Sequence, residues 1–148
     1  MKTILATAIL ALTATAATAA DVGVSVVRDN HAAQTGARVE LALPEFSGFG
    51  ITPTASVTNM PDFYTRYALG GKATLVQLGD FSAGVGVSGV YQATRHGENG
   101  YGVVGALRAD YALTKNVSVF ATVERFWGQH RVSQSNGNVS GVGVSYRF

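Results

Sequence analysis

Seven ionisable side chains stand at alternate positions among small polar residues, in five separate segments. They are Arg38, Glu40, Lys72, Arg108, Asp110, Glu124 and Arg147. Successive side chains of an extended strand point to opposite faces, so this spacing places the charges on one face of each segment. Buried charges need partners of opposite sign, because an isolated one costs several kcal/mol or more. The pattern predicts a charge network that closes an interior, or a narrow ion path lined by the same side chains.

The histidines are the other side chains that could do chemistry. His31, His96 and His130 all fall in predicted loops, and Ser133 follows His130 by three residues. A hydrolytic pair needs a serine held against a histidine by a rigid element, and a loop does not provide one. A metal site shared by His31 and His130 lacks a carboxylate pattern to complete it. We therefore expect no catalytic residue, no metal and no cofactor.

The first twenty residues predict export. Lys2 precedes a short apolar run at 4–12, and small residues then lead to the triplet Ala17-Thr18-Ala19. A charged start, a short apolar core and an A-x-A site are typical of a secretory signal peptide. The apolar run is shorter than the roughly 20 residues of a spanning helix. We predict that residues 1–20 are cleaved and that residues 21–148 form one domain.

Period-two alternation dominates the rest of the chain. It predicts eight strands, at 22–28, 38–43, 49–58, 67–78, 81–94, 101–111, 116–127 and 141–148. Tight turns are predicted at 44–45, 79–80 and 113–115, and longer polar segments at 29–36, 60–65, 95–100 and 128–138. Short turns at one end and longer loops at the other are typical of bacterial transmembrane barrels. An even number of strands then places both termini on the short-turn, periplasmic side.

The faces opposite the charges carry the large apolar side chains. Charged residues make up only 14% of the sequence, which also contains 18 glycines. The polar faces therefore carry too few charged side chains to form the exterior of a water-soluble protein. Aromatic residues gather near strand ends, as in the girdles at membrane interfaces, at Tyr67, Phe81, Tyr91, Tyr101, Tyr111 and Trp127. A soluble β-sandwich or lipocalin-like barrel is the alternative. We predict an all-β, eight-stranded, antiparallel up-and-down transmembrane β-barrel.

The last strand, GVGVSYRF, ends the sequence on an aromatic residue. Gly143, Tyr146 and Phe148 match the C-terminal signal of outer-membrane proteins, in which a glycine precedes spaced aromatics and the chain ends on Phe. Gly141 departs from it, because a polar residue usually stands two positions before the glycine. With its eight strands, the chain resembles the small barrels of the OmpA transmembrane-domain and OmpX type. The resemblance implies the outer membrane of a Gram-negative envelope, contact with lipid and lipopolysaccharide, and a barrel assembly machinery that reads the last strand.

An eight-stranded barrel leaves an interior just wide enough for side chains. We therefore predict a monomeric structural or surface protein with a closed, charge-networked lumen. A porin-like narrow or gated ion pore is the first alternative, and adhesion or lipopolysaccharide binding through the loops is the second. An enzyme acting on lipid A or phospholipids would need a His–Ser pair facing the lipid, which the loop histidines do not supply. The formal net charge of +2 gives no electrostatic case for nucleic acid.

Overall fold

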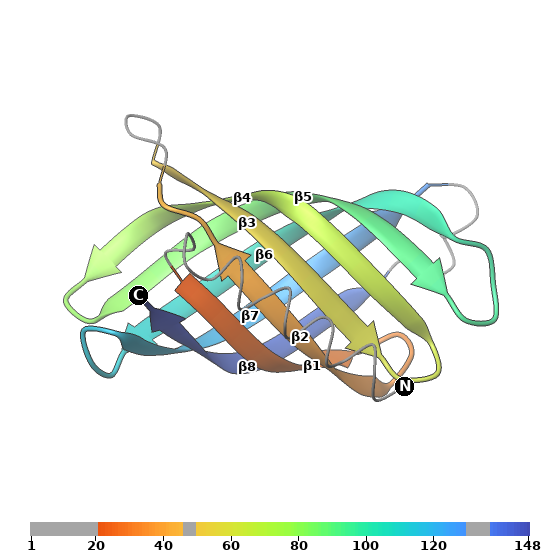
Figure 1. Cartoon of the computed structure of the whole chain (residues 1–148), viewed down its shortest axis with the longest axis horizontal. Coiled ribbons are helices and arrows are strands. Elements are labelled where there is room, and N and C mark those ends of the chain that lie inside the picture. Colours follow the sequence, from red (N-terminus) through yellow and green to blue (C-terminus); the bar gives the residue numbers. More distant parts are fainter. Residues whose placement is uncertain (1–20, 46–49, 130–136) are drawn as a thin grey trace.

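The computed structural model describes residues 21–45, 50–129 and 137–148. The predicted signal peptide, His130 and Ser133 lie outside the described residues. Eight antiparallel strands close into a barrel in sequence order, and β1 pairs with β8 (Figure 1). The strands are β1 Asp21–Asp29, β2 Gln34–Ala42, β3 Ile51–Met60, β4 Tyr64–Leu78, β5 Phe81–Thr94, β6 Gly100–Ala112, β7 Val117–Gly128 and β8 Asn138–Arg147. The predicted eight-stranded up-and-down architecture is confirmed.

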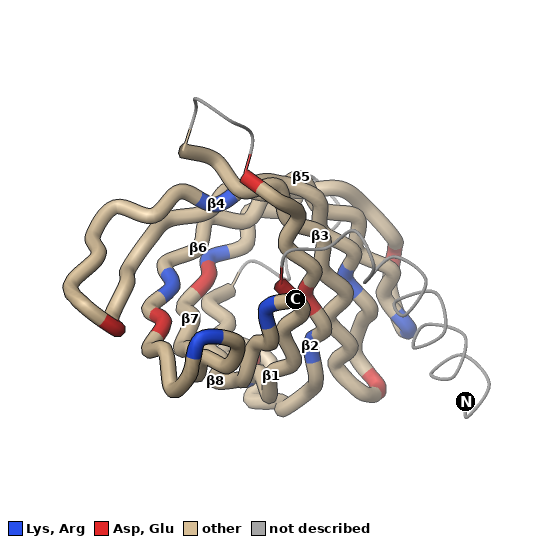
Figure 2. The backbone as a smooth tube through the Cα atoms, turned by 60° about the vertical axis from the view of Figure 1, so that its left-hand side comes forward, with Lys and Arg blue, Asp and Glu red and all other residues tan. Residues whose placement is uncertain are grey.

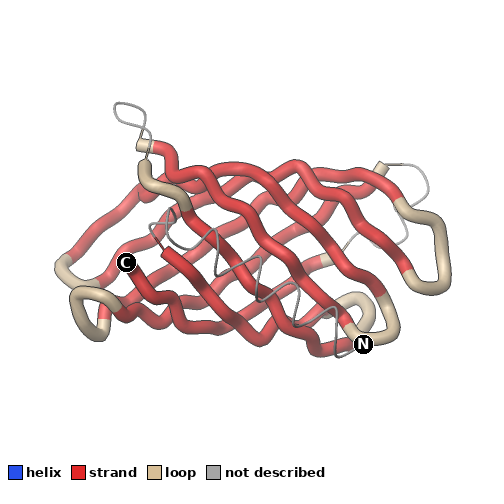
Figure 3. The backbone as a smooth tube through the Cα atoms, in the orientation of Figure 1, coloured by secondary structure: helices blue, strands red, loops and turns tan. Residues whose placement is uncertain are grey.

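The barrel has two ends, which differ in what they carry. Asp21 of β1 lies opposite Arg147 of β8, so both ends of the strand series meet at what we call the terminal end. At the opposite, distal end, turns at 30–33, 61–63 and 95–99 connect neighbouring strands, β7 ends at Gly128 and β8 begins at Asn138. Figure 3 shows that strands make up most of the described chain. The described residues contain no helix that is long and apolar enough to cross a membrane.

The predicted contrast between short turns at one end and long loops at the other holds only in part: the tight turn at 79–80 is confirmed, whereas the segments at 44–45, 60–65 and 29–36 differ from prediction. The predicted tight turn at 44–45 is part of a longer connection, 43–50, at the terminal end. The predicted long segment at 60–65 is a three-residue turn at 61–63, in which the Phe63 N–H donates to the Met60 carbonyl at 3.1 Å. Asp62 adopts the left-handed conformation there, with φ of 64°. Asparagine and aspartate tolerate this conformation, so the chain reverses at once and the strands run further than predicted.

A side-chain cap explains why β2 also begins earlier than predicted. The Asp29 carboxylate oxygen Oδ1 accepts hydrogen bonds from the His31 and Ala32 N–H groups at 2.9 and 3.1 Å. Such Asx-type bonds satisfy the turn's own donors. The turn therefore needs only residues 30–33, and β2 starts at Gln34 rather than at 38.

Large apolar side chains stand on the outside of the barrel. Their exposed fraction ranges from 36% at Val119 to 72% at Leu69. The aromatic residues form two outward bands, one towards the distal end with Tyr67, Tyr91, Tyr101 and Trp127, and one at the terminal end with Phe81, Tyr111, Tyr146 and Phe148. Tyr67, Tyr91 and Tyr101 lie in register across β4, β5 and β6, with neighbouring ring centroids 6.5 and 5.2 Å apart. The inward face carries the charged side chains together with small, polar and buried aromatic or aliphatic ones such as Met60, Tyr64 and Phe126, and these define the lumen.

Candidate functional site: the barrel lumen

Charged residues of both signs are distributed along the strands of the barrel wall (Figure 2). Among the described strand residues, ten charged side chains occupy inward positions: Asp21, Asp29, Arg38, Glu40, Arg66, Lys72, Arg108, Asp110, Glu124 and Arg147. Five are cationic and five are anionic, so the described strands contribute no net formal charge to the lumen. The side chains fall into a terminal cluster, a central ion pair and a distal plug.

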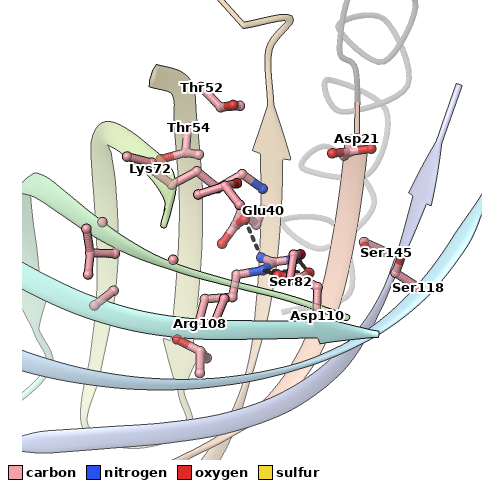
Figure 4. Close-up of a pocket in the computed structure, with 18 of the residues that line it drawn as sticks. Asp21, Glu40, Thr52, Thr54, Lys72, Ser82, Arg108, Asp110, Ser118 and Ser145 are labelled. Atoms are coloured by element: carbon pink, nitrogen blue, oxygen red, sulfur yellow. Dashed lines mark hydrogen bonds and ion pairs between the residues drawn. The ribbon is translucent and has the colours of Figure 1, made fainter. Parts of the chain in front are cut away.

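Arg108 organises the terminal cluster. Its Nη1 donates to Glu40 Oε1 at 2.6 Å, and its Nε and Nη2 donate to the Asp110 carboxylate at 2.7–2.9 Å (Figure 4). Its guanidinium also lies 3.8 Å from the centre of the Phe120 ring. Glu40 is on β2 and Arg108 on β6, four strands apart around the closed barrel, so this bond crosses the lumen.

A second ion pair crosses the middle of the lumen. Both terminal nitrogens of Arg38 bind the Glu124 carboxylate, with Nη2 at 2.6 Å from Oε2, and Arg38 Nε donates to Thr58 Oγ1 at 2.8 Å. Only 3% of the Arg38 side chain and 11% of the Glu124 side chain are exposed. Bidentate arginine–carboxylate pairs are among the strongest side-chain interactions. This pair ties β2 to β7.

The distal plug is built around Arg66, which has no carboxylate partner among the described residues. Its Nε and Nη2 donate to Gln92 Oε1 at 3.1 and 2.8 Å, and its guanidinium lies 4.6 Å from the Tyr64 ring centre and 4.2 Å from the Phe126 ring centre. The Tyr64 hydroxyl donates to Asp29 Oδ2 at 2.9 Å. Two buried apolar clusters complete the plug: Val27, Met60, Tyr64 and Val139 in one, and Val90, Val104 and Phe126 in the other.

A polar cavity of about 350 Å³ fills the terminal half of the lumen. Turn residues such as Asp80 and Lys115 border it, so it reaches the terminal end. Its inner boundary includes Arg38, Arg66 and Glu124, whereas none of the residues of the Val27 cluster lines it. Hydroxyl groups from several strands cover its walls: Thr52, Thr54, Ser56, Ser82, Ser118 and Ser145.

The seven side chains predicted from alternation all occupy inward positions, and the structure joins most of them. Five meet across the lumen in the Arg108 and Arg38 interactions. Lys72 faces the cavity and has no hydrogen bond or ion pair with another described residue. Arg147 is peripheral: its side chain is 66% exposed, and its Nε donates to Asp21 Oδ1 at 3.0 Å.

Sequence reasoning missed the distal half of the lumen. Arg66 and Tyr64 alternate with Ala68 and so continue the inward face of β4, but the strand was predicted to begin at 67. Phe120 and Phe126 alternate with Glu124 and stand inward, each buried to 5% exposure or less. Glycines make room for these rings, because a Cβ at Gly102 would lie 2.4 Å from Phe126 Cε2. These rings could have been found from the sequence, because an aromatic residue at an even spacing from an inward charge such as Glu124 must face the same side of the strand.

The predicted assembly-signal residues divide into two groups. Gly143 lies in the wall, where a Cβ would approach Phe120 Cζ to 2.7 Å and the Val24 carbonyl oxygen to 2.2 Å. Tyr146 and Phe148 are 48% and 66% exposed on the outside, with ring centroids 5.1 Å apart. Gly143 therefore has a packing reason to be glycine that does not depend on any assembly factor.

The loop histidines do not form a cluster that the structure can describe. His31 lies in the turn between β1 and β2, His96 lies between β5 and β6, and His130 is outside the described residues. Within residues 21–45, 50–129 and 137–148, no group of three or more histidine and carboxylate side chains could hold a metal ion.

Solved barrels share this fold at low sequence identity. The N-terminal β-barrel domain of Pseudomonas aeruginosa OprF has a TM-score of 0.67 at 12% identity, over 88% of this chain and 98% of that domain. Neisserial surface protein A has a TM-score of 0.59 at 13% identity, over 86% and 94%. A designed transmembrane β-barrel has a TM-score of 0.65 at 13% identity, over 86% and 93%. No protein-family model and no curated sequence matches the chain. These similarities establish the fold alone.

Proposed function

We propose that this protein is an integral outer-membrane β-barrel with a structural or surface role and a lumen that is closed towards the distal end. The observation that carries the proposal is the inversion of the two faces. Leu69, Leu107 and Val142 are 62–72% exposed on the outside, while Arg38 and Arg66 are buried inside. Water disfavours such an apolar exterior, whereas hydrocarbon requires it. The two aromatic bands fit the two interfaces of a bilayer.

Closure rests on the distal plug. Met60, Tyr64 and Gln92 have no exposed surface, and Phe126 has 1%. An ion that crossed the lumen would have to displace these side chains and separate the Arg38–Glu124 pair. The role is therefore one of a folded membrane element that presents its ends to the two aqueous sides, without catalysis. Reading of the C-terminal strand by an assembly machinery, a monomeric state and contact with lipopolysaccharide belong to the same proposal.

A narrow or gated pore is the second candidate, and the cavity favours it. A polar space of about 350 Å³ already extends from the terminal end to the central ion pair. Only the distal plug then separates this space from the other side. Opening would require a change in Arg66 and the two aromatic rings that hold it.

Planar-bilayer conductance of refolded residues 21–148 tests the proposal. We expect no stable current steps, either from the wild type or from the Arg38→Ala/Glu124→Ala variant, because the plug remains in both. Arg125→Gln, on the outward face of β7 and outside the cavity lining, is the control for a change in charge. Insertion is checked separately, by heat-dependent gel mobility and protease protection in vesicles. Steps in the wild type that change in the double variant would establish the pore, and failure to insert would refute the membrane placement.

A further inference from the structure

The outward face of the described strands carries only two charged side chains, and both are arginines. They are Arg28 on β1 and Arg125 on β7, and both are exposed. Every carboxylate of the described strands occupies an inward position. Neither arginine forms an ion pair or hydrogen bond with another described residue, although Arg125 lies 5.9 Å from the Trp127 ring centre. Two cations thus face outward, and neither is paired with a carboxylate of the described residues.

The two arginines lie close together on the barrel surface. A single strand, β8, separates them, since Arg28 pairs with Ser140 and Arg125 pairs with Asn138. Strand spacings of about 4.8 Å and a rise of about 3.4 Å per residue put the two Cα atoms roughly 12 Å apart. The outward hydroxyl and amide groups of Ser140 and Asn138 lie between them. These four residues form what we call the arginine patch.

An apolar surface continues the arginine patch towards the middle of the barrel. Val26, Val142 and Val123 belong to the next outward positions on β1, β8 and β7, and they are 59%, 65% and 53% exposed. An unpaired arginine on a lipid-facing barrel surface costs about 2–4 kcal/mol at the bilayer midplane but only about 0–1 kcal/mol near an interface. The arginine patch therefore belongs at headgroup depth, and the valines belong at acyl-chain depth.

We propose that the arginine patch binds the phosphate group of a membrane lipid whose acyl chains lie along the three valines. Guanidinium groups match phosphate oxygens with paired, charge-assisted hydrogen bonds. The adjoining apolar surface favours a lipid over free phosphate, because acyl chains along the valines hold the lipid's phosphate at the depth of the two arginines. The inference rests on the proposed membrane function and adds to it a lipid class and a binding position.

Trp127 provides the measurement, because it is the only tryptophan in the sequence and adjoins the arginine patch. The refolded barrel in a non-ionic detergent is titrated with phosphatidic acid whose acyl chains are brominated, which quenches tryptophan fluorescence on contact. Brominated diacylglycerol with the same chains is the phosphate-free comparison. We expect half-maximal quenching at about tenfold lower mole fraction for phosphatidic acid, equivalent to about 1.4 kcal/mol of binding free energy.

Arg28→Gln is the deciding variant, because Arg28 lies two strands from Trp127 and its loss leaves the fluorophore's own contact with Arg125 intact. It should remove most of the preference for phosphatidic acid, whereas Lys115→Gln should keep it. An equal response to both lipids in the wild type, or an unchanged preference in Arg28→Gln, would overturn the phosphate site. Reversal of quenching by millimolar inorganic phosphate would show that a free anion competes equally for the two arginines, and it would overturn the preference for a lipid. Insertion into vesicles tests the membrane function independently.

Discussion

The same eight strands build two halves of the lumen that solve the problem of buried charge differently. In the distal half, Arg66 has no carboxylate partner in the described part of the chain and lies between the Tyr64 and Phe126 rings, with Gln92 as its hydrogen-bond acceptor. In the terminal half, Arg108 has two carboxylate partners and a cavity beside it. In the distal half, two aromatic rings and a neutral amide contact the arginine in place of paired carboxylates.

Side-chain exposure follows the same division. The Arg38–Glu124 pair at the boundary is 3% and 11% exposed, whereas Arg108, Glu40 and Asp110 are 12%, 19% and 26% exposed. Removing one partner of a buried pair leaves an uncompensated charge, which is costly, while a partly hydrated pair can recruit water. The two halves should therefore respond very differently to the same kind of substitution.

The largest effect is expected from Glu124→Ala. It leaves the Arg38 guanidinium buried without its anion, and we expect a loss of about 3–5 kcal/mol in the free energy of unfolding. The matched change in the terminal half is Glu40→Ala, after which Arg108 keeps Asp110 and the cavity. We expect that variant to lose about 1 kcal/mol. Urea unfolding of both variants in the same lipid vesicles measures the difference.

Equal losses for Glu124→Ala and Glu40→Ala would contradict the comparison, because they would mean that water reaches the two ion pairs to the same extent. Glu124→Gln separates the effect of the negative charge from the effect of the hydrogen bond in the Arg38–Glu124 pair, since the amide oxygen of glutamine can still accept a hydrogen bond from Arg38. An intermediate loss for Glu124→Gln would assign the remainder to the missing negative charge.

An intermediate effect is expected from Tyr64→Phe. The hydroxyl donates to buried Asp29, whose other oxygen caps the β1–β2 turn. Loss of one hydrogen bond to a buried carboxylate should cost about 2 kcal/mol. Tyr101→Phe is the control, because Tyr101 is 66% exposed on the outside. Faster amide hydrogen exchange at residues 30–33 in Tyr64→Phe alone would place the loss at the distal end.

Alternation of side chains was enough to predict the fold and the terminal half of the site. Glu40, Arg108 and Asp110 lie in the middle of clearly alternating segments, so their common face could be read directly. The hydrogen bond between Glu40 on β2 and Arg108 on β6 could not be predicted, because only closure of the barrel brings together residues that are far apart in the sequence. The loop lengths failed for a similar reason, since the Asp29 cap and the conformation of Asp62 depend on local geometry.

The distal plug escaped prediction because apolar and aromatic side chains occur on both faces of these strands. Phe126 and Trp127 are adjacent, yet one is buried in the lumen and the other is 48% exposed outside. Only their spacing from the inward Glu124 distinguishes them, because Phe126 is two residues away and Trp127 is three. Arg66 was missed because the predicted strand began at residue 67. Polar residues near a turn cannot be told from a loop by their sequence alone.

The smallest effect should come from adding one methyl group to the wall of the terminal half, and the same change in the distal half serves as its comparison. At Gly86, in the cavity wall, a Cβ would meet nothing nearer than the Gly71 carbonyl oxygen at 3.4 Å. Gly86→Ala should therefore stabilise the barrel by about 0.5 kcal/mol, because alanine loses less conformational freedom than glycine in a strand. At Gly102, the methyl would overlap Phe126, and we expect a loss of about 1–3 kcal/mol. The same urea measurement decides both, and a loss at Gly86 equal to that at Gly102 would mean that the terminal cavity is packed as tightly as the plug.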